Sequence, residues 1–205
     1  MMNLDPSRYY TEFSEACAKF IRDKDCTKYF KRYSPELPRI HAVIGILRSI
    51  SPPSILDVGS GRGRALWPIL NELPKTKVMC VDPVKWRCEV INAVHNGGVK
   101  RVKAINKDIL DFSSNNKFDV VTALEVLEHI PLVKQALKNI LRLAKEFVII
   151  TVPSKPDNNP EHVHFFSEKR IVDLINSIKT EECINKIQVS YVRNSMIVLI
   201  GLKNE

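Results

Sequence analysis

The sequence has no apolar stretch that approaches the about 20 residues needed to cross a bilayer as a helix. Residues 1–10 are polar and lack the apolar core of a secretory signal. Only 5 cysteines occur in 205 residues, and no two of them form a Cys-x-x-Cys pair, so no disulfide framework is indicated. Cys80 and Cys88 are expected to pack inside a strand and the helix that follows it. We therefore expect a cytoplasmic protein without membrane contact.

A long run of basic residues is also missing, although the net charge is +8, from 31 Lys and Arg against 23 Asp and Glu. Dispersed basic residues can attract nucleic acid, or they can simply keep a protein soluble. The charge favours a solvated surface and leaves an RNA partner open. The chain length and its 44% of hydrophobic residues are typical of one globular domain with a substantial core.

From residue 54 onward, short apolar runs alternate with helix-compatible segments. Strands are predicted over 55–58, 77–81, 102–105, 118–123 and 147–152, and helices over 64–73, 85–95, 132–143 and 167–178. Such alternation is typical of a doubly wound, mostly parallel α/β sheet. Strands over 186–192 and 196–202, around a turn at 193–195, predict an antiparallel hairpin that brings the sheet to seven strands. Helices over 5–22 and from Pro38 to 50 would form an N-terminal cap, residues 1–50, packed on the 51–205 core of a single compact domain.

The most informative segment is 55–63, Ile-Leu-Asp-Val-Gly-Ser-Gly-Arg-Gly. It predicts a buried strand that turns sharply into a helix N-terminus, where glycines let backbone and ligand approach closely. A dinucleotide-binding fingerprint would need its third glycine at position 64, where the chain has Arg64. A nicotinamide-dependent dehydrogenase is therefore a disfavoured interpretation.

The segment from Asp57 to Gly63 resembles the first motif of the class I S-adenosylmethionine-dependent methyltransferases, which have a Rossmann-like fold. The resemblance implies that this segment binds S-adenosyl-L-methionine. The residues concerned are Asp57, Gly59, Ser60, Gly61 and Gly63.

Further acids follow at the ends of later strands, in the order that this family has them. Asp82, next to Pro83, matches the acid that accepts hydrogen bonds from the ribose hydroxyls, a role that doubly wound folds often give to an acid there. Asp108 matches the carboxylate that contacts the adenine amino group, and Ile109 would pack on the ring. A turn-forming Asp82 and a solvated Asp108 are the alternatives. Leu124, at the end of the fourth strand, would face the methionine moiety.

The sequence lacks the motifs of methyltransferases that act on two kinds of acceptor. No Asn-Pro-Pro-Tyr or Asp-Pro-Pro-Tyr follows the fourth strand, which disfavours amino-methylation of bases, and no Pro-Cys nucleophile indicates cytosine C5 methylation. A hydroxyl of a small molecule or of RNA is the predicted acceptor. Direct in-line displacement needs mainly alignment, which supplies up to roughly 7–11 kcal/mol in intramolecular models.

The fourth strand is followed by Glu125-Val126-Leu127-Glu128-His129. Helical spacing would place Glu125 and Glu128 one turn apart beside His129, and His162 or His164 could complete a site for a divalent metal such as magnesium. Small-RNA 2′-O-methyltransferases and ubiquinone-pathway O-methyltransferases have a similar Glu-x-x-Glu-His. In many related methyltransferases no metal is recognised there, and Glu125 and His129 would then serve the pocket directly, as catalytic residues or through local hydrogen bonds.

The sequence thus predicts a methyltransferase without an obligate protein partner. The alternative is a module that binds S-adenosylmethionine, has lost catalysis and acts as a partner or sensor. Binding of the cofactor without turnover would distinguish the module from the enzyme.

Overall fold

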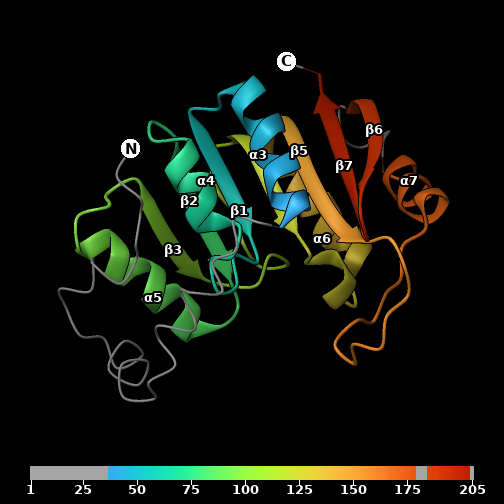
Figure 1. The fold of residues 1–205 in the computed structure, drawn as a ribbon, viewed down its shortest axis with the longest axis horizontal. Coiled ribbons are helices and arrows are strands. Elements are labelled where there is room, and N and C mark those ends of the chain that lie inside the picture. Colours follow the sequence, from blue (N-terminus) through green and yellow to red (C-terminus); the bar gives the residue numbers. More distant parts are fainter. Residues whose placement is uncertain (1–36, 179–183, 204–205) are drawn as a thin grey trace. The chain divides into compact units, whose positions relative to one another are not determined.

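The computed structural model describes residues 37–178 and 184–203. Its seven strands form one sheet in the order β3-β2-β1-β4-β5-β7-β6 (Figure 1). The chain divides into two compact units, Met1–Asp108 and Ile109–Glu205, which are described in turn.

The described part of the first unit, from residue 37 to 108, contains three parallel strands and three helices. β2 lies between β1 and β3, and its residues Val78 and Asp82 are paired with Val102 and Asn106 of β3. β1 is buried from Ile55 onward, as expected for a parallel strand covered on both faces. The elements of this unit are α3 (Pro38–Ile50), β1 (Ser54–Val58), α4 (Leu66–Glu72), β2 (Lys77–Asp82), α5 (Lys85–Asn96) and β3 (Val102–Asn106).

α3 illustrates how the sequence determines these elements. Pro38 fits the first helical turn, where its missing N–H would have no partner, and Ser51 ends the helix in the left-handed conformation at φ 53°. Its buried residues recur at helical spacing and form one apolar face. They are Ile40, Val43, Ile44 and Leu47.

The second unit joins parallel and antiparallel strands. β4 and β5 are parallel, whereas β7 is antiparallel to both β5 and β6. β6 and β7 form a hairpin closed by the pair Val192 and Ser195, and Arg193 in the turn has a φ of 53°. The elements of this unit are β4 (Phe118–Leu124), η2 (Leu127–His129), α6 (Val133–Leu143), β5 (Ala144–Pro153), α7 (Glu168–Asn176), β6 (Ile184–Val192) and β7 (Ser195–Leu202).

The predicted fold class is confirmed, because every strand and every helix predicted from Pro38 onward is present. The boundaries that differ most from the prediction are the starts of α4, at Leu66 instead of 64, of β5, at Ala144 instead of 147, and of β6, at Ile184 instead of 186. α7 ends at Asn176 instead of 178. The helix expected over 5–22 lies outside the described residues, and the cap formed by residues 1–50 stays a prediction. Within 37–178 and 184–203, no helix combines the length and apolarity that a membrane span requires.

Candidate functional site

The glycine turn after β1 depends on left-handed backbone conformations. Gly59, Gly61 and Gly63 have φ angles of 65°, 54° and 75°, which side chains disfavour. A Cβ at Gly63 would also overlap the indole of Trp67. This ring is fully buried, and its Nε1 donates a hydrogen bond to the Arg62 carbonyl at 3.2 Å. Gly63 therefore makes room for a core side chain, whereas the sequence suggested room for a ligand.

The turn leads into α4 two residues later than predicted. Arg64 and Ala65 continue the turn, and α4 begins only at Leu66. Pro68 falls in the first helical turn, where a missing N–H is tolerated. The Trp67 N–H already donates to the Gly63 carbonyl at 3.0 Å. This bond has the i→i−4 spacing of an α-helix, so the turn is continuous with the start of α4.

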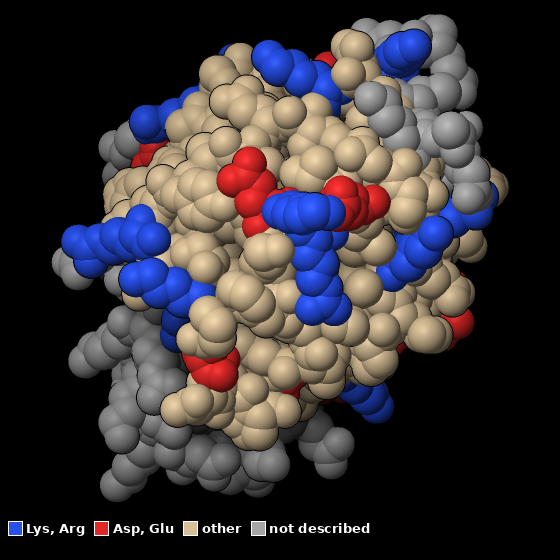
Figure 2. Space-filling model, turned by 90° about the vertical axis from the view of Figure 1, so that its right-hand side faces the viewer, with Lys and Arg blue, Asp and Glu red and all other residues tan. Residues whose placement is uncertain are grey.

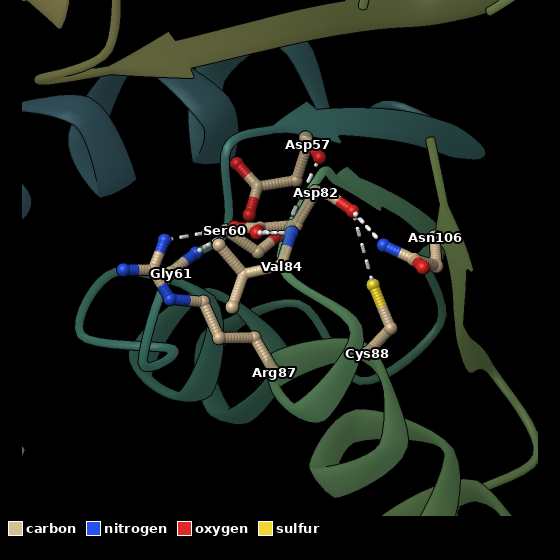
Figure 3. A network of polar contacts seen from close by, with 8 residues as sticks. All are labelled: Asp57, Ser60, Gly61, Asp82, Val84, Arg87, Cys88 and Asn106. Atoms are coloured by element: carbon tan, nitrogen blue, oxygen red, sulfur yellow. Dashed lines mark hydrogen bonds and ion pairs between the residues drawn. The ribbon is translucent and has the colours of Figure 1, made fainter. Parts of the chain in front are cut away.

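The side chain of Asp82, at the end of β2, is fully buried and connects the surrounding turns (Figure 3). Its Oδ2 accepts a hydrogen bond from the Gly61 N–H, and its Oδ1 accepts one from the Val84 N–H, both at 2.9 Å. Arg87 Nη1 on α5 lies 3.5 Å from Oδ2. These donors compensate the charge of a carboxylate that burial would otherwise disfavour. The bond from Val84 also shows that Asp82 forms the turn before α5, which was the alternative interpretation.

The backbone carbonyl of Asp82, like its side chain, has hydrogen-bond partners. It accepts hydrogen bonds from Asn106 Nδ2 at 3.0 Å and from Cys88 Sγ at 3.4 Å. Burial and, to a smaller extent, the negative charge of Asp82 together raise the pKa of the Cys88 thiol to about 11. Burial likewise raises the pKa of the Cys80 thiol, with a contribution from Asp57. Both thiols are therefore protonated at neutral pH, and both are buried, in β2 and in α5, as the sequence indicated.

The remaining predicted cofactor residues lie at strand ends. Asp57 is buried near the end of β1, and its carbonyl accepts a hydrogen bond from Ser60 Oγ at 3.2 Å. Pro83 follows Asp82 directly and is exposed. Asp108, which follows β3, is half-buried and ends the first unit.

In the second unit, Ile109 is buried, and Asn139 Nδ2 of α6 donates to the carbonyls of Ile109 and Leu110 at 3.1 and 3.0 Å. Leu124 is the last residue of β4 and is half-buried. The side chain of Asn139 thus fixes the backbone beside Ile109.

Glu125 has a strained backbone, with a φ of 56° that is uncommon for a residue other than glycine. Its N–H donates to the carbonyl and to Oγ1 of Thr151 in β5, at 2.9 and 3.1 Å. Only Leu127–His129 is helical, as a single 3-10 turn. Glu125 and Glu128 therefore do not share a helix, and this expectation was wrong because the bonds to Thr151 hold Glu125 outside the helix.

Three of the four predicted metal ligands lie together. Ligand atoms of Glu128, His129 and His162 are all within 4.8 Å of one another, and among the described residues Glu125 does not join this group. The two imidazole rings meet edge to face, with centroids 4.7 Å apart. Glu128 is buried, and its backbone carbonyl accepts hydrogen bonds from the N–H groups of Val163 and His164 at 2.9 and 3.1 Å. These bonds bring the loop after β5 against the 3-10 turn.

Hydrogen bonds to Nδ1 orient both histidines of this cluster. His129 Nδ1 lies 3.0 Å from the Glu161 carbonyl, which can only accept, so Nδ1 carries the proton. His162 Nδ1 lies 2.9 Å from Asp157 Oδ1. Nε2 of each ring is then the nitrogen that can offer a lone pair, as in metal-binding histidines held by a second shell of oxygen acceptors.

His164 is held differently and has a structural role. Its Nε2 lies 3.3 Å from the Pro131 carbonyl, and its Nδ1 lies 3.2 Å from Arg170 Nη2, a donor. Both ring nitrogens are thus engaged by the chain. Of the two histidines that the sequence offered for the metal, the structure therefore brings His162 to the cluster.

Exposed apolar side chains flank the cluster. Val163 and Phe165, on either side of His164, are 52% and 39% exposed, and Leu132, next to Pro131, is 58% exposed. The hydrogen bond between His164 and the Pro131 carbonyl holds these two segments together. An apolar surface of this kind commonly marks a binding site.

Comparison with known proteins agrees with this geometry. Residues 56–146 match the family model described as a methyltransferase domain. The matched segment is 91 of the 205 residues, so this part of the chain is similar to a methyltransferase domain.

The ubiquinone biosynthesis O-methyltransferase of Rickettsia canadensis (strain McKiel) is 28% identical over 106 residues, which are 52% of this chain and 44% of that protein. The chain thus matches less than half the length of this curated relative.

Solved structures of methyltransferases share the fold of this chain. Magnesium protoporphyrin IX methyltransferase (ChlM) from Synechocystis PCC 6803 with bound SAH superimposes with a TM-score of 0.65 at 14% identity, covering 91% of this chain and 100% of that one. The methyltransferase domain of bacterial CtHen1 gives a TM-score of 0.62 at 15% identity, covering 82% and 100%. At these identities the likeness concerns the fold alone.

Several residues that organise the site were missed from the sequence. Arg87 and Asn106 reach Asp82 from α5 and β3, and Asp157 orients His162. The sequence held one usable signal: in Asp157-x-Asn159-x-Glu161, the Asp157 side chain accepts a hydrogen bond from the Asn159 N–H, and the Asn159 side chain accepts one from the Glu161 N–H. Such a pair of Asx turns predicts an ordered loop before His162.

Proposed function

We propose that this chain is an S-adenosylmethionine-dependent methyltransferase that methylates a hydroxyl group of a small molecule with an apolar part. The observation that carries the proposal is the buried Asp82 carboxylate at the end of β2, tied to the glycine turn after β1 by the Gly61 N–H. In doubly wound folds, the carboxyl ends of the strands are where nucleotide-like ligands bind. A buried acid with fixed orientation suits a ribose diol, so the residues present fit the cofactor.

The cofactor-binding roles follow from position along the chain. Asp82 would accept hydrogen bonds from the ribose hydroxyls, and Asp108 would accept one from the adenine amino group, with Ile109 against the ring. Asp57, Gly59 and the other residues of the turn, Ser60, Gly61 and Gly63, would enclose the methionine end, together with Pro83, Leu124 and Glu125. S-adenosylmethionine, when bound, supplies an electrophilic methyl group that a hydroxyl oxygen can displace from sulfur.

The chain's own contribution to the reaction is positioning and removal of a proton. Alignment of the reacting atoms supplies most of the acceleration in such transfers. His129 is the proposed general base, because its Nδ1–H is held by the Glu161 carbonyl and its Nε2 lone pair is left for the acceptor proton. Glu125 is the second residue proposed near the reacting groups, held in place by its strained backbone.

The same cluster supports a second role, as a binding site for a divalent cation. Glu128, His129 and His162 would be the ligands, and Asp157 and the Glu161 carbonyl would be their second shell. Two imidazoles and one carboxylate suit Zn²⁺ or Mn²⁺ better than Mg²⁺, which prefers oxygen ligands. A bound cation would lower the pKa of the acceptor hydroxyl, and His129 would then act as a ligand instead of a base.

The acceptor class follows from the surface beside this cluster. Leu132, Val163 and Phe165 offer apolar contact next to His129. An RNA end would require grouped Lys and Arg side chains for its phosphates. On the face shown in Figure 2 the basic side chains are spread among uncharged and acidic side chains and form no single large patch. These observations favour a small apolar alcohol or phenol over RNA.

Methyl transfer from labelled S-adenosylmethionine tests the proposal. Phenols and catechols with an apolar substituent, matched phenols without it, and an RNA with a free 3′ end are the acceptors to compare. We expect label on the hydroxyl of the apolar phenols. Label on RNA alone would overturn the acceptor class, and cofactor binding without transfer to any acceptor would favour the non-catalytic module.

A further inference from the structure

Arg87 reaches the same carboxylate that is proposed to bind the ribose. Its Nη1 lies 3.5 Å from Asp82 Oδ2, and the two residues come from adjacent elements, α5 and the end of β2 (Figure 3). The Asp82 side chain is fully buried, whereas 34% of the Arg87 side chain is exposed. The guanidinium therefore approaches the carboxylate from the solvent side.

The acceptor capacity of Asp82 is limited. Each carboxylate oxygen offers about two lone-pair directions. The Val84 N–H uses one direction on Oδ1, and the Gly61 N–H uses one on Oδ2. Arg87 Nη1 is a second donor group near Oδ2, at 3.5 Å, so Oδ2 has two of these polar partners and Oδ1 has one. A ribose diol brings two O–H donors and needs one direction on each oxygen.

Of the three donors around Asp82, Arg87 is the one that can leave. The other two are backbone amides, fixed by the glycine turn and by the start of α5. Among the described residues, Arg87 Nε has no hydrogen-bond partner, so the ion pair is the main polar contact of this side chain. Its guanidinium carbon lies 5.7 Å from the Trp86 ring centroid, a contact that could hold the cation after it leaves Asp82.

We infer that Arg87 competes with the cofactor ribose for Asp82 Oδ2 and thereby weakens cofactor binding. This inference rests on the proposed function, because it takes Asp82 as the ribose acceptor. In the ligand-free chain Arg87 compensates the buried charge. When the ribose binds, its hydroxyl replaces the guanidinium. The net free energy of cofactor binding is therefore reduced by the loss of the ion pair between Arg87 and Asp82.

The dissociation constant of S-adenosylhomocysteine, measured by calorimetry on the full chain, tests this competition. Arg87→Met keeps much of the side-chain volume and removes the charge. We expect it to bind about fivefold more tightly than the wild type, as loss of a partly exposed competing ion pair implies. Lys85→Met is the matched control, because Lys85 belongs to the same helix and pairs with Glu89 instead of Asp82. It should change the affinity by less than about twofold.

An analogue that lacks one ribose hydroxyl isolates the contact. Removing the hydroxyl should weaken binding more in Arg87→Met than in the wild type, because the arginine no longer occupies the acceptor in the variant. Equal losses in both proteins, or weaker binding of S-adenosylhomocysteine by a folded Arg87→Met, would overturn the competition. If neither the wild type nor the variants bind S-adenosylhomocysteine, the proposed function itself fails, and this inference fails with it. Thermal unfolding of each variant verifies that it is folded.

Discussion

The Asp82 network and the Glu128–His129–His162 cluster are built in different ways. Asp82 stands at a strand end, and the residues that contact it come from the turns, helix and strand next to β2. The cluster joins a single 3-10 turn to a loop, and it depends on hydrogen bonds between residues far apart in the sequence. The first arrangement follows from the sheet itself. The second requires a particular loop conformation, so under the proposed function acceptor chemistry would vary there without change to the residues proposed to bind the cofactor.

Gly63→Ala should have the largest effect, because it disrupts the glycine turn after β1, which is proposed to bind the cofactor. The new methyl group would overlap the Trp67 indole at a φ of 75°, so we expect a loss of about 4 kcal/mol in unfolding free energy. Gly45→Ala is the control, since a Cβ there meets nothing within 4 Å in a helix, and it should stabilise the chain by about 0.5–1 kcal/mol. Urea unfolding measures both changes. An unaltered stability in Gly63→Ala would show that this turn does not constrain Trp67.

Asp82→Asn should separate the two regions, because it should weaken cofactor binding and leave metal binding by the histidine cluster unchanged. Replacing a buried, hydrogen-bonded carboxylate should weaken S-adenosylhomocysteine binding by roughly 100-fold in calorimetry. Affinity for a divalent cation should stay unchanged, because Asp82 is not part of the histidine cluster. Asp111→Asn, at an exposed position, serves as the control. A variant that is folded and binds S-adenosylhomocysteine like the wild type would show that the ribose site lies elsewhere.

Asp157→Asn tests the other region. The amide keeps an oxygen for the Asn159 N–H but loses the charge that orients His162, so affinity for Zn²⁺ and Mn²⁺ should fall about tenfold. Asp173→Asn, on the exposed face of α7, is the matched control. Titration calorimetry with each metal chloride gives the values, and Mg²⁺ should bind more weakly than either. Tighter binding of Mg²⁺ than of Zn²⁺ would contradict the assigned donor set.

Leu132→Ser should have the smallest effect and should act on the acceptor alone. Loss of this exposed apolar contact, worth about 1 kcal/mol when covered by a ligand, should raise KM for an apolar phenol about fivefold. The KM for S-adenosylmethionine should stay the same. Steady-state kinetics with a phenol lacking the apolar substituent provides the control, because its KM should not respond. Equal changes for both phenols would remove Leu132 from the acceptor surface.

The same contrast explains which features could be predicted from the sequence. Buried strands and their order follow from local apolar runs, and Asp82 could be placed because parallel strand ends meet at one edge. Arg87 could not, because its approach depends on how α5 returns along the sheet. Asn106 could not either, because its contact depends on the pairing of β3 with β2.

The geometry of Glu125 could not be predicted for another reason. Helical spacing suggested that Glu125 and Glu128 lie on one helix face, but two hydrogen bonds to Thr151 hold Glu125 in a left-handed conformation. Thr151 is remote in the sequence, and nothing local to Glu125 indicates the contact. That His162, and not His164, lies in the cluster also depends on tertiary contacts, because the Pro131 carbonyl and Arg170 engage the His164 ring.

Calorimetric titration of S-adenosylhomocysteine into the wild-type chain, in buffer with excess chelator, tests the central claim most directly. If the network around Asp82 holds the cofactor independently of the histidine cluster, binding will be saturable and its affinity will be the same with and without divalent cations. Absence of binding, or binding that appears only when a cation is added, would contradict this account.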